Sequence, residues 1–118
     1  MAYVDGFVIP VPKKNLAAYR RIAKQAGRIW KKYGALEYRE CVGDDLAVKY
    51  GMPFPRLSKL KAGETVVFSW IVYKSKTHRN SVNKKVMTDP AIAKMMKMKP
   101  IFDDKRMTYG GFKVMVDM

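Results

Sequence analysis

The most strongly patterned stretch of the chain runs from Glu64 to Ser75 and has almost no polar interruption. Its β-branched and aromatic residues predict a strand. Both alternating sets of side chains are largely apolar, namely Val66, Phe68, Trp70 and Val72 on one face and Val67, Ser69, Ile71 and Tyr73 on the other. We therefore expect this strand in the centre of a sheet whose two faces are both covered.

Three other stretches alternate apolar and polar positions in the way that strands do. They are Ala2–Val11, Ala35–Val42 and Arg106–Asp117. The second of them is the more polar and is expected at an edge of the sheet. In the third, Gly110 and Gly111 indicate a bulge or the close approach of another part of the chain.

Helical spacing occupies the segments between these strands. Apolar residues recur every three or four positions from Lys13 to Tyr33, and Gly34 is suited to end that helix. A serine cap predicts a second helix over Lys76–Thr88. The pair Asp89–Pro90 predicts the start of a short third helix, because aspartate caps helices and proline suits their first position.

The connection over residues 46–63 has no clear periodicity, and Met52–Pro55 is its apolar centre. So long a connection is uncommon in a small domain and indicates a role of its own. Two interpretations stay open. Phe54 fixes the loop against the body or a neighbouring subunit, or the loop covers a ligand.

The predicted order is strand, helix, strand, strand, helix, strand, which is typical of an α+β protein of the ferredoxin-like βαββαβ type. Residues 1–118 then form a single domain with a four-stranded antiparallel sheet, the first and third strands in its centre and the helices on one face. The other face keeps many apolar side chains. We expect a second copy to bury it in a homodimer, since large exposed apolar patches are rare on monomers.

Charge adds a second feature to this picture. The chain has 24 Lys and Arg against 10 Asp and Glu, a net charge of +14, which favours association with polyanions such as nucleic acid. The first predicted helix carries a basic row, formed by Arg20, Lys24, Arg28 and Lys31. The row is a candidate nucleic-acid surface or simply a solvated face of a helix that packs on the sheet.

The remaining composition excludes several classes of protein. No apolar run reaches the roughly 20 residues of a membrane helix, and no secretory signal is recognised, so a cytoplasmic protein that makes no membrane contact is expected. Cys41 is the single cysteine, which excludes an intramolecular disulfide, and we expect it to be buried as a small apolar residue. With His78 as the single histidine, no metal site is expected, and no motif calls for a cofactor.

Three residues are candidates for catalysis: Asp5, His78 and Tyr109. Asp5 lies inside a strand, where burial raises the pKa of a carboxyl, or where an arginine holds it in a structural ion pair. His78 lies near a helix start, where the helix dipole favours its neutral form. Tyr109 adjoins two glycines, and its hydroxyl is a candidate donor into a cavity between sheet and helices.

Three further residues are candidates to line a ligand pocket: Trp70, Arg39 and Arg106. Trp70 offers an indole N–H from the central strand, although core packing is the commoner use of such a tryptophan. Arg39 and Arg106 are the expected partners of Asp5.

Five separated segments carry a resemblance that spans nearly the whole chain: Tyr3–Val8, Gly34–Tyr38 with Glu40 and Cys41, Val66–Ile71 with Tyr73 and Ser75, Val86–Pro90, and Lys105–Phe112. They resemble the uncharacterised bacterial YbaA-like family. The resemblance implies a dimeric α/β-barrel, in which two ferredoxin-like sheets pack face to face. That superfamily also contains antibiotic-biosynthesis-type monooxygenases and haem-degrading enzymes, which bind substrate between sheet and helices. The chain differs from the family pattern around Tyr50–Pro53 and at Asp104.

Together these features favour a homodimer with a pocket for a small apolar or acidic ligand between sheet and helices. The alternative is a basic protein associated with nucleic acid. Neither the substrate nor an enzymatic activity follows from the sequence.

Overall fold

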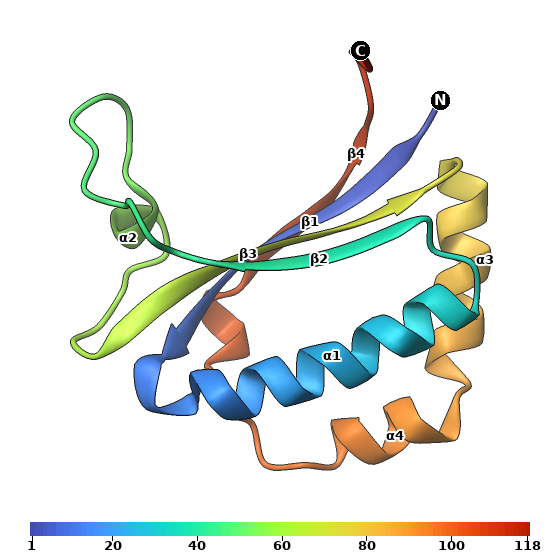
Figure 1. Ribbon diagram of the computed structural model, residues 1–118, viewed down its shortest axis with the longest axis horizontal. Helices are drawn as coiled ribbons and strands as arrows, with labels where there is room; N and C mark the ends of the chain where they lie inside the picture. Colours follow the sequence, from blue (N-terminus) through green and yellow to red (C-terminus); the bar gives the residue numbers. More distant parts are fainter.

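Four strands form one antiparallel sheet, and three of the helices lie on one of its faces in the computed structural model, which describes residues 1–118 (Figure 1). The strands are β1 (Tyr3–Pro12), β2 (Glu37–Val42), β3 (Glu64–Tyr73) and β4 (Thr108–Lys113). The helices are α1 (Leu16–Lys32), α2 (Phe54–Leu57), α3 (Lys76–Met87) and α4 (Pro90–Met96), with 3-10 turns at Lys13–Asn15 and Asp104–Arg106.

The strand order is β2-β3-β1-β4, so the first and third strands are central, as the sequence predicts. β1 and β3 pair along their whole length, from Tyr3 opposite Tyr73 to Pro12 opposite Glu64. The predicted α+β class and four-stranded antiparallel sheet are confirmed.

The core lies between the sheet and helices α1, α3 and α4. One group of buried side chains joins Tyr73 of β3 to Val82 and Val86 of α3, and these three residues are almost completely buried. A second group joins β1 and β3 to α1 through residues such as Val11 and Tyr19. Because side chains alternate along a strand, these core positions are the odd-numbered residues of β1 and β3.

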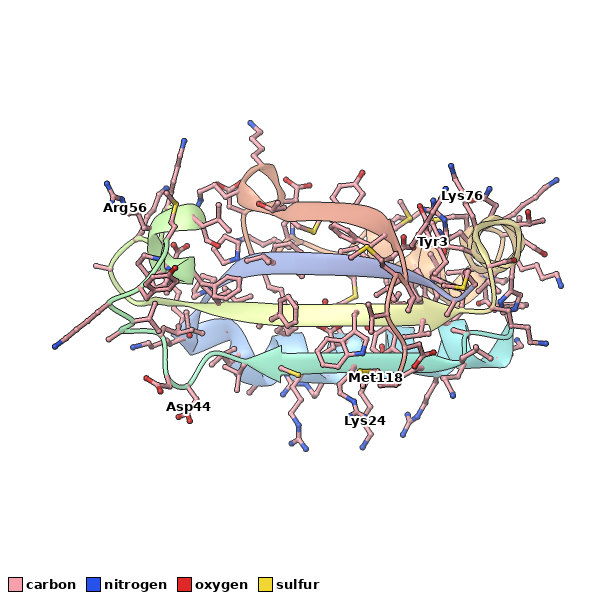
Figure 2. The ribbon with its side chains drawn as sticks, turned by 90° about the horizontal axis from the view of Figure 1, so that it is seen from above. Tyr3, Lys24, Asp44, Arg56, Lys76 and Met118 are labelled. Atoms are coloured by element: carbon pink, nitrogen blue, oxygen red, sulfur yellow. The ribbon has the colours of Figure 1, made fainter.

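The opposite face of the sheet carries no helix along its length, and we call it the open face. Figure 2 views this face, with β4, β1, β3 and β2 side by side. Phe68 and Phe112 are 44% and 62% exposed there. The ring of Phe54, from α2, lies 6.0 Å from that of Phe68, so the long connection reaches one end of this face. The sequence predicts that both faces of β3 are covered. The structure shows one of these faces covered, by α1 and α3.

Some predicted boundaries were wrong, and backbone hydrogen bonding gives the reasons. β4 spans Thr108–Lys113 instead of Arg106–Asp117, because its partner β1 begins at Tyr3 and the pairing ends with the N–H of Val114 on the carbonyl of Ala2. Similarly β2 begins at Glu37, because the N–H of Ala35 still bonds to the carbonyl of Trp30 at the end of α1.

The end of α1 follows the sequence prediction. Gly34 has a φ of 113°, a left-handed conformation that favours glycine after a helix. α1 is the longest helix at 17 residues, and none of the helices has the length and apolar character needed to cross a membrane.

Candidate functional site

A cavity of about 540 Å³ lies between the helix-facing side of the sheet and helices α1 and α3. Most of its lining is apolar or aromatic, including Phe7, Ile22, Ala26, Ile71, Met87 and Phe102. The polar lining comes from Asp5, Glu40, Ser69, Arg79 and Asn83, with the hydroxyls of several tyrosines. A mainly apolar cavity with a few polar groups is the usual form of a small-molecule site.

Asp5 and Arg79 form the polar group at one end of the cavity. Asp5 is only 6% exposed, and a guanidinium nitrogen of Arg79, Nη1, lies 3.3 Å from its carboxylate oxygen Oδ1. Arg79 also donates from Nη2 to the hydroxyl of Tyr3 at 3.4 Å and stacks over that ring at 5.0 Å. Its Nε is buried and makes no hydrogen bond.

Asn83 joins three elements beside this ion pair. Its side-chain oxygen accepts hydrogen bonds from the indole of Trp30 in α1, at 3.1 Å, and from the hydroxyl of Tyr73 in β3, at 3.2 Å. Burial raises the pKa of Asp5, while Arg79, Asn83 and Tyr73 act in the opposite direction. Burial and the nearby charge of Asp5 raise the pKa of Tyr73.

Glu40 of β2 forms the second polar group of the cavity. The hydroxyl of Tyr19 donates to Oε1 at 2.7 Å, and the hydroxyl of Tyr38 donates to Oε2 at 2.6 Å. Burial, with the charge of Glu40, raises the pKa of both tyrosines. From the strand register, the Cα atoms of Asp5 and Glu40 are about 12 Å apart, two strand spacings across and two residues along.

A second hollow of about 390 Å³ lies on the other side of this Glu40 group, between α1 and β2. Tyr19, Tyr38 and Glu40 line both spaces and so separate them. Arg20 and Lys24 also line the second hollow, which gives it a basic side.

The structure places only some of the predicted catalytic residues at the cavity. Asp5 lies in it, and Tyr109 lies at its margin, 69% exposed and stacked on Phe7 at 5.9 Å. His78 is not part of the lining. Its Nδ1 accepts the N–H of Lys74, and its own backbone N–H bonds to Ser75, so it has a structural role at the start of α3.

The expected pairing of Asp5 with Arg39 or Arg106 is wrong, because Arg79 is its partner. Arg106 lies away from the cavity and holds Glu64 through two hydrogen bonds of 2.7 and 2.6 Å, and Asp103 through a third. The bonds from Arg106 lower the pKa of Glu64 to about 2.

Trp70 and Arg39 border the cavity, but their side chains interact elsewhere. Alternation along β3 directs Trp70 to the open face, opposite to Ser69 and Ile71. Its indole donates to Glu37 at 2.8 Å, and the Arg39 guanidinium lies 5.9 Å from its ring. The structure therefore places these two predicted pocket residues at the border of the cavity, with their side chains in contact with each other and with Glu37.

The basic row of α1 is exposed throughout: Arg20, Lys24, Arg28 and Lys31. Figure 2 shows Lys24 projecting outward beyond the β2 edge. Lys31 also donates to the carbonyl of Leu36. Cys41 is only half-buried, so the expectation of a buried cysteine was wrong.

Sequence reasoning missed Arg79, Asn83, Tyr73 and Glu40. A signal existed for three of them. Glu40 alternates with Tyr38 and Val42, which makes it a carboxylate on an otherwise apolar strand face. Arg79 and Asn83 are spaced by four residues in the predicted helix and so share a face. No three histidine, cysteine, aspartate or glutamate side chains gather as a metal site would require.

The fold and cavity define an α+β protein whose helices cover one face of a four-stranded antiparallel sheet. Residues 2–104 match a family model described as "Protein of unknown function (DUF1428)", and the chain belongs to this family. It is 43% identical over 117 residues to proteins named "Uncharacterized protein YbaA" from Escherichia coli (strain K12) and Shigella flexneri, with 99% of each chain covered.

A solved structure titled "De novo designed protein Foldit4" is similar in fold. Its TM-score is 0.50 at 15% sequence identity, and the match covers 97% of this chain and 99% of the other. Such a likeness concerns the fold alone.

Proposed function

We propose that this protein binds a small molecule in the cavity between the sheet and helices α1 and α3, and that it acts as a homodimer. The cavity itself is the observation on which the binding proposal rests. Its volume of about 540 Å³ is in the usual range for ligand sites, and its lining combines apolar walls with two polar groups.

The polar groups support binding over simple packing. Burying a carboxylate or guanidinium in an apolar core is unfavourable unless the charge is paired and hydrogen-bonded. The side chain of Asp5 is 9% exposed and that of Arg79 is 22% exposed, and their ion-pair distance of 3.3 Å is long. A bound molecule that forms further hydrogen bonds with these two side chains would compensate for the cost of burying their charges.

The open face supports the homodimer. Phe68 and Phe112 are exposed there, and Phe54 continues the aromatic surface from α2. The residues after β4 rise from the same face in Figures 1 and 2, and Met115 and Val116 among them are exposed. A second copy that packs on this face buries these apolar groups and produces a two-sheet barrel.

The ligand proposal is tested by a thermal-shift screen of a small-molecule library, run on the wild type and on Ala26→Phe. Ala26 lines the cavity, so a phenylalanine ring there reduces the available volume. We expect compounds that raise the melting temperature of the wild type and have a smaller effect on the variant. Ala17→Phe is the matched control, because Ala17 is an exposed position of α1. A screen without any stabilising compound, or stabilisation unchanged by Ala26→Phe, contradicts the proposal.

The dimer is tested by light scattering at micromolar concentration. We expect twice the chain mass of 13.6 kDa for the wild type and a shift toward monomer for Phe68→Lys. Tyr50→Lys is the control, because Tyr50 is exposed in the long connection. A monomer mass for the wild type removes the dimer from the proposal.

A second candidate function is nucleic-acid association through the basic row of α1. Its support is geometric. Arg20, Lys24, Arg28 and Lys31 are all exposed, span about 16 Å of helix, and α1 contains no acidic residue. The test compares RNA and DNA binding of the wild type with that of Arg20→Glu/Lys24→Glu/Arg28→Glu over a salt titration. No affinity at about 50 mM salt, or equal affinity of the variant, rejects this function.

A further inference from the structure

Arg79 has more hydrogen-bond donors than the protein uses. A guanidinium group carries five N–H donors, and in Arg79 only Nη1 and Nη2 have partners, at 3.3 and 3.4 Å. The Nε is buried without a partner. Nε has almost no accessible surface, so the donors left for a bound molecule are the unused N–H groups of Nη1 and Nη2 at the cavity lining.

Arg106, in the same molecule, uses four of its five N–H donors, one of them on the carbonyl of Lys59. It makes two hydrogen bonds of 2.7 and 2.6 Å to Glu64 and one of 3.0 Å to Asp103. Charge-assisted pairs are commonly this short. The longer Asp5 contact therefore leaves Arg79 able to take a stronger acceptor.

The hydrogen-bond acceptors of Glu40 and Asn83 at the cavity, in contrast, already have donors. Each oxygen of Glu40 already receives a short hydrogen bond from a tyrosine hydroxyl. The oxygen of Asn83 receives two, from Trp30 and Tyr73. The missing group is thus an acceptor placed near Arg79, and a negatively charged acceptor gives the strongest bond to a guanidinium.

The net charge of the molecule also favours a negatively charged ligand. The net charge of +14 raises the local concentration of anions. The basic hollow between α1 and β2, with Arg20 and Lys24, adjoins the cavity and shares the Glu40 group with it.

We infer that the ligand is an organic anion with an apolar, preferably aromatic, body and a single carboxylate, which Arg79 binds while the body fills the apolar part of the cavity. This inference rests on the proposed small-molecule function. The ring-bearing walls, among them Phe7 and Phe102, suit an aromatic or alkyl body.

Binding of this anion places two carboxyl groups at one guanidinium. Asp5 faces Arg79 and Asn83 of α3, Tyr73 of β3 and, through Arg79, Tyr3 of β1. Since Arg79 then shares its charge with the ligand, it stabilises the Asp5 anion less, and Asp5 takes up a proton. Affinity for the anion therefore falls as pH rises.

The test uses three probes with one body and different heads: phenylbutyrate, phenylbutanol and phenylbutylamine. Calorimetry on the full chain is expected to show the acid binding roughly tenfold tighter than the alcohol, because its bond to Arg79 is charge-assisted. Asp5→Asn is expected to bind the acid more tightly than the wild type at neutral pH and to lose the pH dependence.

The decisive variant is Asp5→Asn/Arg79→Met, which removes both charges and so leaves no unpaired buried ion to prevent folding. It is expected to bind acid and alcohol equally. If the acid preference persists in this variant, or if the wild type binds the alcohol or amine as tightly as the acid, the inference is wrong and the small-molecule proposal stands. Binding of none of the three also overturns the inference, whereas the small-molecule proposal fails if the library screen finds no ligand or if stabilisation is unchanged by Ala26→Phe.

Discussion

At Gly27, α1 packs directly against the ring of Tyr38 in β2. A Cβ atom built on Gly27 lies 2.7 Å from Cδ1 and 2.8 Å from Cε1 of Tyr38. Tyr38 is held in place by its 2.6 Å hydrogen bond to Glu40 and lines the cavity. Gly27→Ala therefore inserts a methyl group into a contact that has no room for it.

Two opposing effects decide whether Gly27→Ala raises or lowers the free energy of unfolding. Alanine in place of glycine stabilises a helix interior by about 1 kcal/mol. Overpacking a core typically costs about 1–3 kcal/mol, and a distance under 3 Å to two ring atoms belongs in the upper part of that range. We expect a net loss of about 1–2 kcal/mol in the free energy of unfolding.

Urea denaturation of a double-mutant cycle with Tyr38→Leu checks the cause. All four proteins are compared at one concentration, because the proposed dimerisation would make apparent stability depend on concentration. Without the ring, Gly27→Ala should stabilise the protein by up to about 1 kcal/mol, so the sign of the effect reverses. The reasoning is refuted if Gly27→Ala destabilises both backgrounds equally.

Three further outcomes follow from single contacts. Val86→Ala should cost about 2–3 kcal/mol in urea unfolding, because Val86 is fully buried, whereas the exposed Lys85→Ala should cost under about 0.5. Ser75→Ala should cost about 1 kcal/mol through loss of the bond to the N–H of His78, and Ser75→Asp should largely retain stability, as thermal unfolding will show. Hydrogen bonds from Arg106 lower the pKa of Glu64 from 4.5 to about 2. Between these two pH values the unfolded chain therefore binds more protons than the folded chain. The stabilisation that ionised Glu64 gives to the fold is complete above pH 4.5 and is lost as the pH falls toward 2. The stability difference between wild type and Glu64→Gln, measured by denaturation at each pH, should shrink as the pH falls from 4.5 toward 2. A difference that stays constant would contradict this prediction.

The arrangement of the elements followed largely from local sequence patterns. The apolar run of β3, the alternation in β1, the serine cap of α3 and the glycine after α1 were sufficient to predict these elements, and the order of elements predicted the sheet and its central strands. The ends of β4 were not predictable in this way, because they depend on where the partner strand begins. The helix α2 was missed because it has only four residues within an irregular connection.

For the candidate site, the sequence identified Asp5 as a carboxylate inside a strand and gave it the wrong partner. Arg39, Arg106 and Arg79 are equal candidates when only charge is considered. Arg39 is directed away from Asp5 by strand alternation, and Arg106 is already held by Glu64. Only the packing of α3 against the sheet brings Arg79 to Asp5.

The sequence by itself determined the periodicities, and hence the strands, the main helices, the basic row and the apolar character of both faces of β3. These are local properties, since each depends on residues a few positions apart. The tertiary structure decided which polar groups meet in the cavity, because Asp5, Glu40 and Arg79 come from three separate elements whose contacts depend on packing. It also showed that the ring of Tyr38 fits beside Glu40 because residue 27 is a glycine without a Cβ atom. The spacing of residues along the chain does not predict this contact.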